Sequence, residues 1–350
     1  MRFSMEMQNE IEKQILLSAS IRMKSSDIVQ NVSKKFDIST RTVNKYIEKL
    51  FIQKRLIKSS KEGKDTIYSP KYERNFKSFE LKDFSDESII WTKYLKEVFL
   101  EKNISRNLIN ALDYGMTEMI NNVIDHSEAK LMNVTMALGE VDMVVMIEDD
   151  GVGIFNKLCK ELDLGDIRYA LMELYKGKVT SDPLNHTGEG IFFTSRLFDK
   201  FFIVSENLVF HGHKDGDEIF NDDEINAGTR VIIKQRLDMQ RTVMEVFNEF
   251  SDPDAVPGFF RTVIDMKKFI LEGESLVSRS QAKRFVKGFE KFLEVVLDFR
   301  DIEFVGQGFA DQIFRVFTRE NPKVEIIPIN MNADVEFMIK RAARGSSDNL

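Results

Sequence analysis

The pattern of hydrophobic and polar positions divides the chain into three parts of different periodicity. In residues 1–70, apolar positions first recur at helical spacing and then alternate, which predicts three helices followed by a strand, a turn and a strand. The middle part combines long helical patterns with apolar strands such as 143–147. After a polar break at 251–254, strand and helix patterns alternate, which predicts a small parallel or mixed sheet covered by helices. We therefore predict an α+β multidomain protein with a head at 1–70, a polar linker at 71–84, a central α/β domain at 85–250 and a tail at 256–344.

The composition excludes several classes of protein. Of the 350 residues, 43% are hydrophobic and 31% are charged, which is typical of a globular protein. One cysteine, Cys159, cannot form an internal disulfide, and with only four histidines a structural zinc site is not expected. No apolar run approaches the roughly 18 residues of a membrane span, and the charged first residues lack a signal-peptide core. We expect a cytoplasmic protein with no membrane partner.

The net charge of −7 is unevenly distributed along the chain. Residues 1–75 contain 16 Lys and Arg against 9 Asp and Glu, whereas the remainder contains 34 against 48. A basic head on an acidic body suggests a polyanionic partner for the head alone. A solvated basic surface would give the same imbalance.

The third predicted helix of the head carries polar and basic residues opposite its apolar stripe. Ser39 or Thr40 can cap this helix, and a basic turn joins the two strands that follow it. This arrangement resembles a winged helix-turn-helix, which implies binding of double-stranded DNA, with a protein-interaction module of the same fold as the alternative. The resemblance assigns DNA contacts to the recognition helix and the wing, namely Arg41, Asn44, Lys45, Lys49, Lys61 and Lys64.

Three polar motifs follow one another in the middle part. In a helix that continues past Thr117, Glu118, Asn122 and His126 are four residues apart and share one face. An apolar strand then ends in acidic residues and two glycines, in the sequence Glu-Asp-Asp-Gly-Val-Gly at 148–153. The sequence His-Thr-Gly-Glu-Gly at 186–190 leads into an apolar helix, whose N-terminal amides would attract an anion. Each motif alone is weak, because a solvated helix face, a turn and a helix start use the same residues.

The order of the three motifs, followed by Gly228-Thr229 before a last strand, resembles the GHKL superfamily over residues 85–240. This superfamily includes gyrase, heat-shock chaperone, histidine-kinase and mismatch-repair ATPases, and the resemblance implies an α/β sandwich, with a mixed sheet covered by helices, that binds ATP and Mg²⁺. It implies that Asn122 ligates the metal, that Asp149 accepts a hydrogen bond from the adenine amino group, and that Glu118 acts as general base. The residues implied to contact the nucleotide are Asn122, Asp149, Gly151, Gly153, Thr187, Gly188, Glu189, Gly190 and Thr229.

Two further features follow from this resemblance. The residues from about Asp163 to Thr187 would form a mobile lid, in which Lys176 and Lys178 either approach the phosphates or lie on the surface. His126 is not expected to accept phosphate, because it lies inside the motif helix and no dimerisation-and-phosphotransfer hairpin precedes it.

The tail carries a separate set of motifs. The sequences at 278–283, 297–299 and 308–311 resemble a STAS-like domain of unknown function, and the spacing of Ser278 and Gln281 predicts a helix-capping box. Anti-anti-sigma STAS proteins carry a phosphorylatable Ser or Thr in the turn after the central strand. Here that turn reads Val-Gly-Gln-Gly at 305–308, so we do not expect the central domain to phosphorylate it. Ser278 and Ser280 remain possible acceptors, although helix capping explains them.

The three parts together suggest a nucleotide-controlled switch, expected to be a slow ATP hydrolase, that couples the ATP state to DNA or partner binding. Such a switch would serve transcriptional control or bacterial defence. The alternative is a Ser/Thr protein kinase of the anti-sigma-factor type that acts on a separate STAS-like partner. A pure interaction protein is disfavoured because the motifs are intact. A protein partner for the tail and a homodimer are further possibilities.

Overall fold

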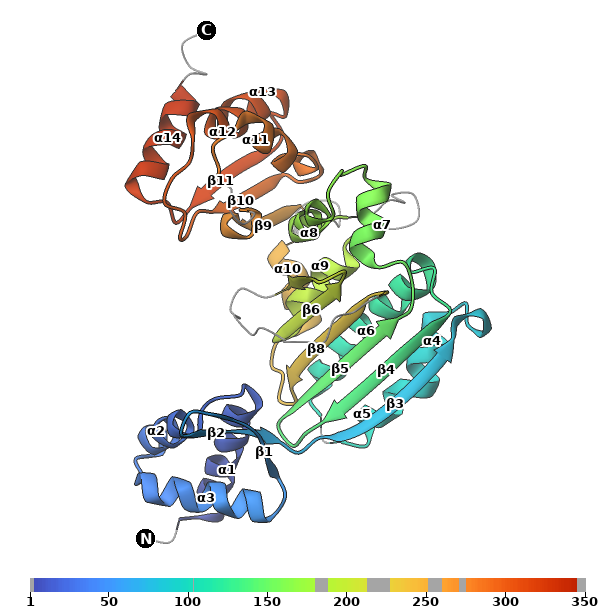
Figure 1. Cartoon of the computed structure of the whole chain (residues 1–350), viewed down its shortest axis with the longest axis vertical. Helices are drawn as coiled ribbons and strands as arrows, with labels where there is room; N and C mark the ends of the chain where they lie inside the picture. The colour runs from blue at the N-terminus through green and yellow to red at the C-terminus, as the bar shows by residue number, and fades with distance from the viewer. Residues whose placement is uncertain are drawn as a thin grey trace.

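The computed structural model describes residues 3–102, 104–179, 188–212, 227–250, 260–270 and 275–344. The N-terminal domain, the central domain and the C-terminal domain lie in a row, with the central sheet in the middle (Figure 1). No helix in these ranges is both long enough and apolar enough to cross a membrane.

The N-terminal domain consists of α1 (Met5–Ser20), α2 (Ser25–Phe36), α3 (Thr40–Ile52) and a hairpin of β1 (Leu56–Glu62) and β2 (Asp65–Pro70). The apolar faces of its helices form a core of their own. As predicted, Ser39 caps α3, since its side chain accepts a hydrogen bond from the Thr42 amide.

The start of α2 is capped by the hairpin and not by the polar residues at its own N-terminus, Ser25, Ser26 and Asp27. Asp65 Oδ1 accepts hydrogen bonds of 2.9 Å from the Ser25 hydroxyl and from the Ser26 amide. These bonds lower the pKa of Asp65, the Ser26 amide contributing most. A partner forty residues away in the sequence cannot be read from local spacing.

The central domain contains a six-stranded sheet in the order β3-β4-β5-β8-β6-β7. Every neighbouring pair is antiparallel, so the mixed sheet that we expected is wrong for this domain. Its strands are β3 (Glu73–Glu80), β4 (Leu131–Leu138), β5 (Asp142–Asp149), β6 (Lys200–Ser205), β7 (Leu208–His211) and β8 (Arg230–Arg236).

The segment expected to be a linker, 71–84, contributes the edge strand β3. It pairs with β4 along its whole length, from Glu73 opposite Leu138 to Glu80 opposite Leu131. Only Phe79 of β3 is buried. An edge strand with one buried side chain has no apolar alternation, and its polar sequence therefore resembles a linker.

Helices cover one face of this sheet (Figure 1). The longest, α6 (Arg106–His126), packs against α9 (Gly190–Leu197) and places Met119, Ile120 and Val123 in the main core. The remaining elements of the domain are α4 (Glu87–Ile90), η2 (Trp91–Leu95), α5 (Lys96–Leu100), α7 (Ile154–Glu161), α8 (Ile167–Lys176) and α10 (Val243–Phe250).

The C-terminal domain has a parallel three-stranded sheet of β9 (Arg261–Asp265), β10 (Glu294–Asp298) and β11 (Glu325–Ile329). The predicted capping box is present at the start of α11 (Arg279–Phe285), where Ser278 and Gln281 exchange side-chain and backbone hydrogen bonds. The other helices are α12 (Gln307–Asp311), η5 (Gln312–Phe317), α13 (Thr318–Glu320) and α14 (Ala333–Arg344).

The three domains contact one another through defined residues. Val141, in the turn between β4 and β5, packs into the core of the N-terminal domain. Arg55 bonds to Glu12 within the N-terminal domain and to Glu140 of the central domain. On the opposite side, a single hydrophobic cluster continues from the central domain into the C-terminal domain.

Candidate functional site

The three motifs of the central domain meet around one pocket. The pocket is bounded by α6, the C-terminal end of β5, the start of β8, one side of α7 and the start of α9. Of the residues predicted from the sequence, Glu118, Asn122, Asp149, Gly153, Gly188, Gly190 and Thr229 line it. Thr187 lies outside the described residues.

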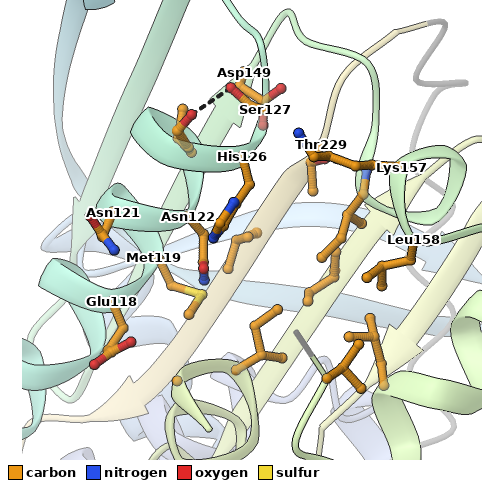
Figure 2. A pocket seen from close by; sticks show the side chains of 18 of the residues that line it. Glu118, Met119, Asn121, Asn122, His126, Ser127, Asp149, Lys157, Leu158 and Thr229 are labelled. Atoms are coloured by element: carbon orange, nitrogen blue, oxygen red, sulfur yellow. Dashed lines mark hydrogen bonds between the residues drawn. The ribbon is translucent and has the colours of Figure 1, made fainter. Parts of the chain in front are cut away.

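One face of α6 forms a wall of the pocket. Figure 2 shows Glu118, Asn122 and His126 at successive turns of this helix, as their four-residue spacing predicts. Asn122 Nδ2 is buried and has no hydrogen-bond partner among the residues that the structure describes. An unsatisfied buried amide costs about 1–3 kcal/mol, so this side chain is suited to a bound polar group.

Asp149 ends β5 inside the pocket. Its Oδ1 accepts a hydrogen bond of 2.8 Å from the Gly151 amide, and its own amide donates to the Thr229 carbonyl at 3.0 Å. Burial raises the pKa of Asp149 to about 6, against the lowering effect of the backbone hydrogen bonds at this carboxylate. The site therefore holds a poorly hydrated carboxylate that accepts hydrogen bonds at neutral pH.

Thr229 fixes the start of α7. Its hydroxyl accepts a hydrogen bond of 3.0 Å from the Ile154 amide, and its carbonyl accepts one of 3.0 Å from the Asp149 amide.

Two glycines allow the backbone to approach Asp149 and its turn closely. Gly228 has φ +80°, and a β-carbon there would lie 1.9 Å from the Asp149 carbonyl oxygen. Gly151 lies against the end of α6, where a β-carbon would meet the Ser127 carbonyl oxygen at 2.1 Å. Any side chain at either position would displace the strand end that carries the carboxylate.

Glu206, which the sequence analysis did not single out, lies beside this turn. Gly153 has φ +81°, and its missing β-carbon would be 1.6 Å from Glu206 Oε1. Glu206 also accepts a hydrogen bond of 2.9 Å from Asn156 Nδ2. Burial raises its pKa, and its charge adds to the raised pKa of Asp149. The sequence did not indicate a turn at Glu206 and Asn207, because both residues have a positive φ although neither is the glycine that usually marks such a turn.

The second glycine motif lies at the start of α9. Glu189 occupies the N-cap position, and no side chain caps the helix there. Gly190 faces Glu118, and a β-carbon at this position would lie 2.1 Å from Glu118 Oε2. The helix N-terminus is thus open to an anion next to a carboxylate of α6.

Basic residues are scarce in the described part of the pocket. Lys157 of α7 is the one Lys or Arg that lines it there, and it was not predicted. Its ammonium lies 3.3 Å from Glu128 and 3.7 Å from Glu161. The expected lid lysines bind the C-terminal domain, because Lys176 donates to the Lys287 carbonyl and Lys178 to the Lys291 carbonyl.

A magnesium ion carried by a nucleotide fits these residues. Asn122 lines the pocket, and its side-chain amide oxygen is a hard ligand of the type that Mg²⁺ accepts. Its buried Nδ2 is a donor and needs an acceptor such as a phosphate oxygen. Among the described residues, no three or more His, Cys, Asp or Glu side chains cluster as a metal site. With Asn122 as the side-chain ligand, Mg²⁺ would be held mainly by phosphate oxygens and water.

The residues predicted to contact DNA lie on the N-terminal domain. Arg41, Asn44 and Lys45 are exposed on α3, and Lys61 and Lys64 are exposed on the hairpin. Lys49 differs from them, since its ammonium lies 2.6 Å from Glu12 Oε1, a buried carboxylate that Arg55 also contacts.

The central domain combines an antiparallel sheet covered by helices on one face with a pocket between α6 and two glycine turns. Two family models match the chain. Residues 90–210 match the histidine kinase-like ATPase domain, and residues 281–336 match a STAS-like domain of unknown function. The chain therefore contains a histidine kinase-like ATPase domain followed by a STAS-like domain. No curated protein matches the sequence.

Proposed function

We propose that the protein binds ATP with Mg²⁺ in the pocket of its central domain and works as a nucleotide-controlled switch. The observation that carries the proposal is the half-buried carboxylate of Asp149, whose pKa burial raises to about 6, at the end of a pocket lined by Asn122 and the start of α9. A carboxylate held apart from water needs a hydrogen-bond donor to compensate its burial, and the adenine amino group is such a donor.

Different residues of the pocket would bind different parts of the nucleotide. Asp149 would accept the hydrogen bond from the base, while the amides of Gly188, Glu189 and Gly190 would donate to phosphate oxygens. Asn122 would hold Mg²⁺, which neutralises phosphate charge when it is bound. The match of this segment to the histidine kinase-like ATPase domain supports the assignment.

Hydrolysis would depend on Glu118. Its carboxylate faces the start of α9, where the phosphates would lie, and it could orient a water molecule and accept its proton. We propose slow hydrolysis, which would reset the switch. The same carboxylate could activate a protein hydroxyl group, so a Ser/Thr kinase reaction uses the same residues.

The output would be DNA binding by the N-terminal domain. Its three helices and hairpin agree with a winged helix, and α3 exposes Arg41, Asn44 and Lys45. This domain contacts the ends of β5 and β8 opposite to the nucleotide pocket: Lys234 of β8 donates to the Ser20 carbonyl, and Val141 packs into the core of the N-terminal domain. A shift of these strands on nucleotide binding would reach the N-terminal domain directly.

The first experiment is calorimetric titration with ATP and Mg²⁺, together with an assay of phosphate release. We expect Asn122→Ala to weaken binding at least about tenfold in the presence of Mg²⁺. Glu118→Ala should bind within about threefold of the wild type but lose about 10²- to 10⁴-fold in hydrolysis. Asn110→Ala is the matched control, because Asn110 is exposed on the same helix.

The outcomes separate the alternatives. A wild type that binds no nucleotide at millimolar concentration contradicts the proposal. Transfer of labelled γ-phosphate to a protein, rather than to water, would favour the kinase of the anti-sigma-factor type over the switch.

A further inference from the structure

The residues just before the second glycine motif bind the C-terminal domain. Lys178 Nζ donates to the Lys291 carbonyl, and Lys291 Nζ donates to the Lys178 carbonyl, each at 3.2 Å. The Lys178 ammonium also lies 5.4 Å from the centre of the Phe292 ring. Two lysines thus bond to each other's backbone across the boundary between the two domains.

At Lys176, the C-terminal domain also holds the end of α8. The buried hydroxyl of Thr262, on β9, donates to the Lys176 carbonyl at 2.7 Å. Lys176 is itself only 2% exposed, and its ammonium bonds to Glu173 at 2.6 Å and to the Lys287 carbonyl at 2.9 Å. The Lys176 ammonium has lost most of its hydration at this contact, so its hydrogen bond to the Lys287 carbonyl is needed to offset that cost when the two domains are docked.

The same short segment forms part of the nucleotide pocket. Val179 follows Lys178 directly and lines the pocket together with Gly188. The Val179 amide donates to the Gly188 carbonyl at 3.2 Å. Gly188 has φ +70°, and a β-carbon there would be 2.7 Å from the Val179 carbonyl carbon and 2.9 Å from that of Lys178. The peptide held by Lys291 therefore packs directly on the first glycine of the phosphate-binding turn.

We propose that the STAS-like domain is a structural part of the nucleotide site: through Lys291, Thr262 and the Lys287 carbonyl it positions Lys176–Val179, and with them Gly188. Lys178 and Lys291 are positioning residues, since each ammonium is directed to the backbone of the other domain. Nucleotide affinity then depends on docking of the C-terminal domain, and by linkage the nucleotide must strengthen that docking by the same factor. This inference rests on the proposed nucleotide binding.

The test compares Lys178→Met, Lys291→Met and the double variant in the full chain. Methionine keeps most of the length of the side chain but removes the donor. Lys283→Met is the matched control, since Lys283 is exposed on α11 of the same domain. We expect the two single variants to weaken binding of a non-hydrolysable ATP analogue about three- to tenfold. The double variant should be little worse than either single one, because the two bonds act as one unit.

A second measurement reports on docking of the C-terminal domain onto the central domain, independently of the affinity for the ATP analogue. We expect the analogue to slow amide hydrogen exchange at residues 287–298 in the wild type and in Lys283→Met, but not in the double variant. Thr262→Val, which removes a hydroxyl while keeping the shape of the side chain, should reduce affinity in the same direction as Lys291→Met. Binding that is unchanged or tighter in the Lys178, Lys291 and Thr262 variants overturns the inference. If instead the wild type binds no analogue, the proposed nucleotide function fails first, so the two failures are distinguishable.

Discussion

Asp142 and Asp149 lie at the two ends of the same strand, β5, and both carboxylates have a raised pKa because of burial. Asp142 lies at the contact with the N-terminal domain, where it accepts a hydrogen bond of 2.9 Å from the Tyr72 hydroxyl and lies 3.8 Å from Lys234 Nζ. Asp149 lies in the pocket of the central domain that is proposed to bind nucleotide. One strand therefore connects the two sites that the proposed switch must couple. Each end of this strand carries a carboxylate, Asp142 or Asp149, whose ionisation depends on the charges around it.

Replacement of Asp149 by Asn should change binding and stability in opposite directions. Because an amide oxygen is a weaker acceptor than a carboxylate, we expect nucleotide affinity to fall about 10- to 100-fold. The folded protein holds a proton on Asp149 up to a pKa of about 6, above the ordinary 3.8, so the wild type loses stability as pH rises from about 4 to 6. Asp149→Asn should remove that loss and melt at a higher temperature near pH 7.

The neighbouring Asp150 provides the control for this prediction. Its Oδ1 accepts hydrogen bonds from the amides of Lys130 and Leu131, and these bonds lower its pKa, the Leu131 amide contributing most. Asp150→Asn should leave nucleotide affinity unchanged and lower the melting temperature above about pH 4. A lower melting temperature for Asp149→Asn at neutral pH, or binding equal to the wild type, would contradict the role given to Asp149.

Replacement of Gly228 by Ala should disrupt the pocket through the backbone. The left-handed φ costs about 1–2 kcal/mol for a residue with a β-carbon, and the collision with the Asp149 carbonyl oxygen adds about 1–3 kcal/mol. Chemical denaturation followed by fluorescence would measure the decrease in the free energy of unfolding, and we expect nucleotide binding to be abolished with it.

Gly63→Ala isolates the first of these two costs. Gly63 has φ +60°, and a β-carbon there has no heavy atom within 4 Å. This variant should be destabilised by only about 1–2 kcal/mol and bind nucleotide like the wild type. Equal effects of the two substitutions would show that the approach of Gly228 to Asp149 does not matter.

The sequence predicted those parts of the site that depend on local spacing. The face shared by Glu118, Asn122 and His126 follows from helix geometry alone, and the capping box of Ser278 and Gln281 follows from a three-residue interval. Contacts between distant segments were not predictable in the same way. Glu206 reaches Gly153 from another turn, and Lys178 reaches Lys291, 113 residues further along the chain. The edge strand β3 was missed because its exposed positions other than Phe76 are polar, and its two apolar residues, Phe76 and Phe79, fall on opposite faces and give no alternation.

Replacement of Arg55 by Met should uncouple the N-terminal domain from the central domain. The guanidinium bonds to Glu140 Oε2 at 2.7 Å and to Glu12, whose side chain is only 6% exposed. Burial opposes ionisation of Glu12, yet the bonds from Lys49 and Arg55 lower its pKa. Removal of Arg55 leaves a buried carboxylate with one partner fewer, which should cost about 2–4 kcal/mol. Urea denaturation would measure this destabilisation.

The exposed partner of Arg55 provides the control. Glu140→Gln removes an ion pair whose carboxylate side chain is 47% exposed, so its cost should stay below about 1 kcal/mol. If ATP changes DNA affinity in the wild type, that change should disappear in Arg55→Met, which removes the contact with Glu140. It should be reduced less in Glu140→Gln, whose amide oxygen can still accept a hydrogen bond from Arg55. A nucleotide effect that survives in Arg55→Met would mean that the coupling does not pass through this contact.

Removal of basic residues from α3 should change the salt dependence of DNA binding. Arg41 and Lys45 are exposed on the same helix as Asn44. For each phosphate that a variant no longer neutralises, the slope of log K against log salt should become shallower by about 0.9. We expect Arg41→Ala and Lys45→Ala to show this reduction with duplex DNA. Lys49→Met should change the slope less, because its ammonium already bonds to Glu12.

A matched control for these variants lies outside the N-terminal domain. Lys160→Ala removes the same charge from an exposed position of α7 and should leave the slope unchanged. The slopes are measured by titrating labelled duplex DNA at several salt concentrations, because phosphate neutralisation by Lys and Arg releases counterions from the duplex. A wild type that binds no DNA at low salt, or equal slopes in all these variants, would show that the basic N-terminal domain has a different partner.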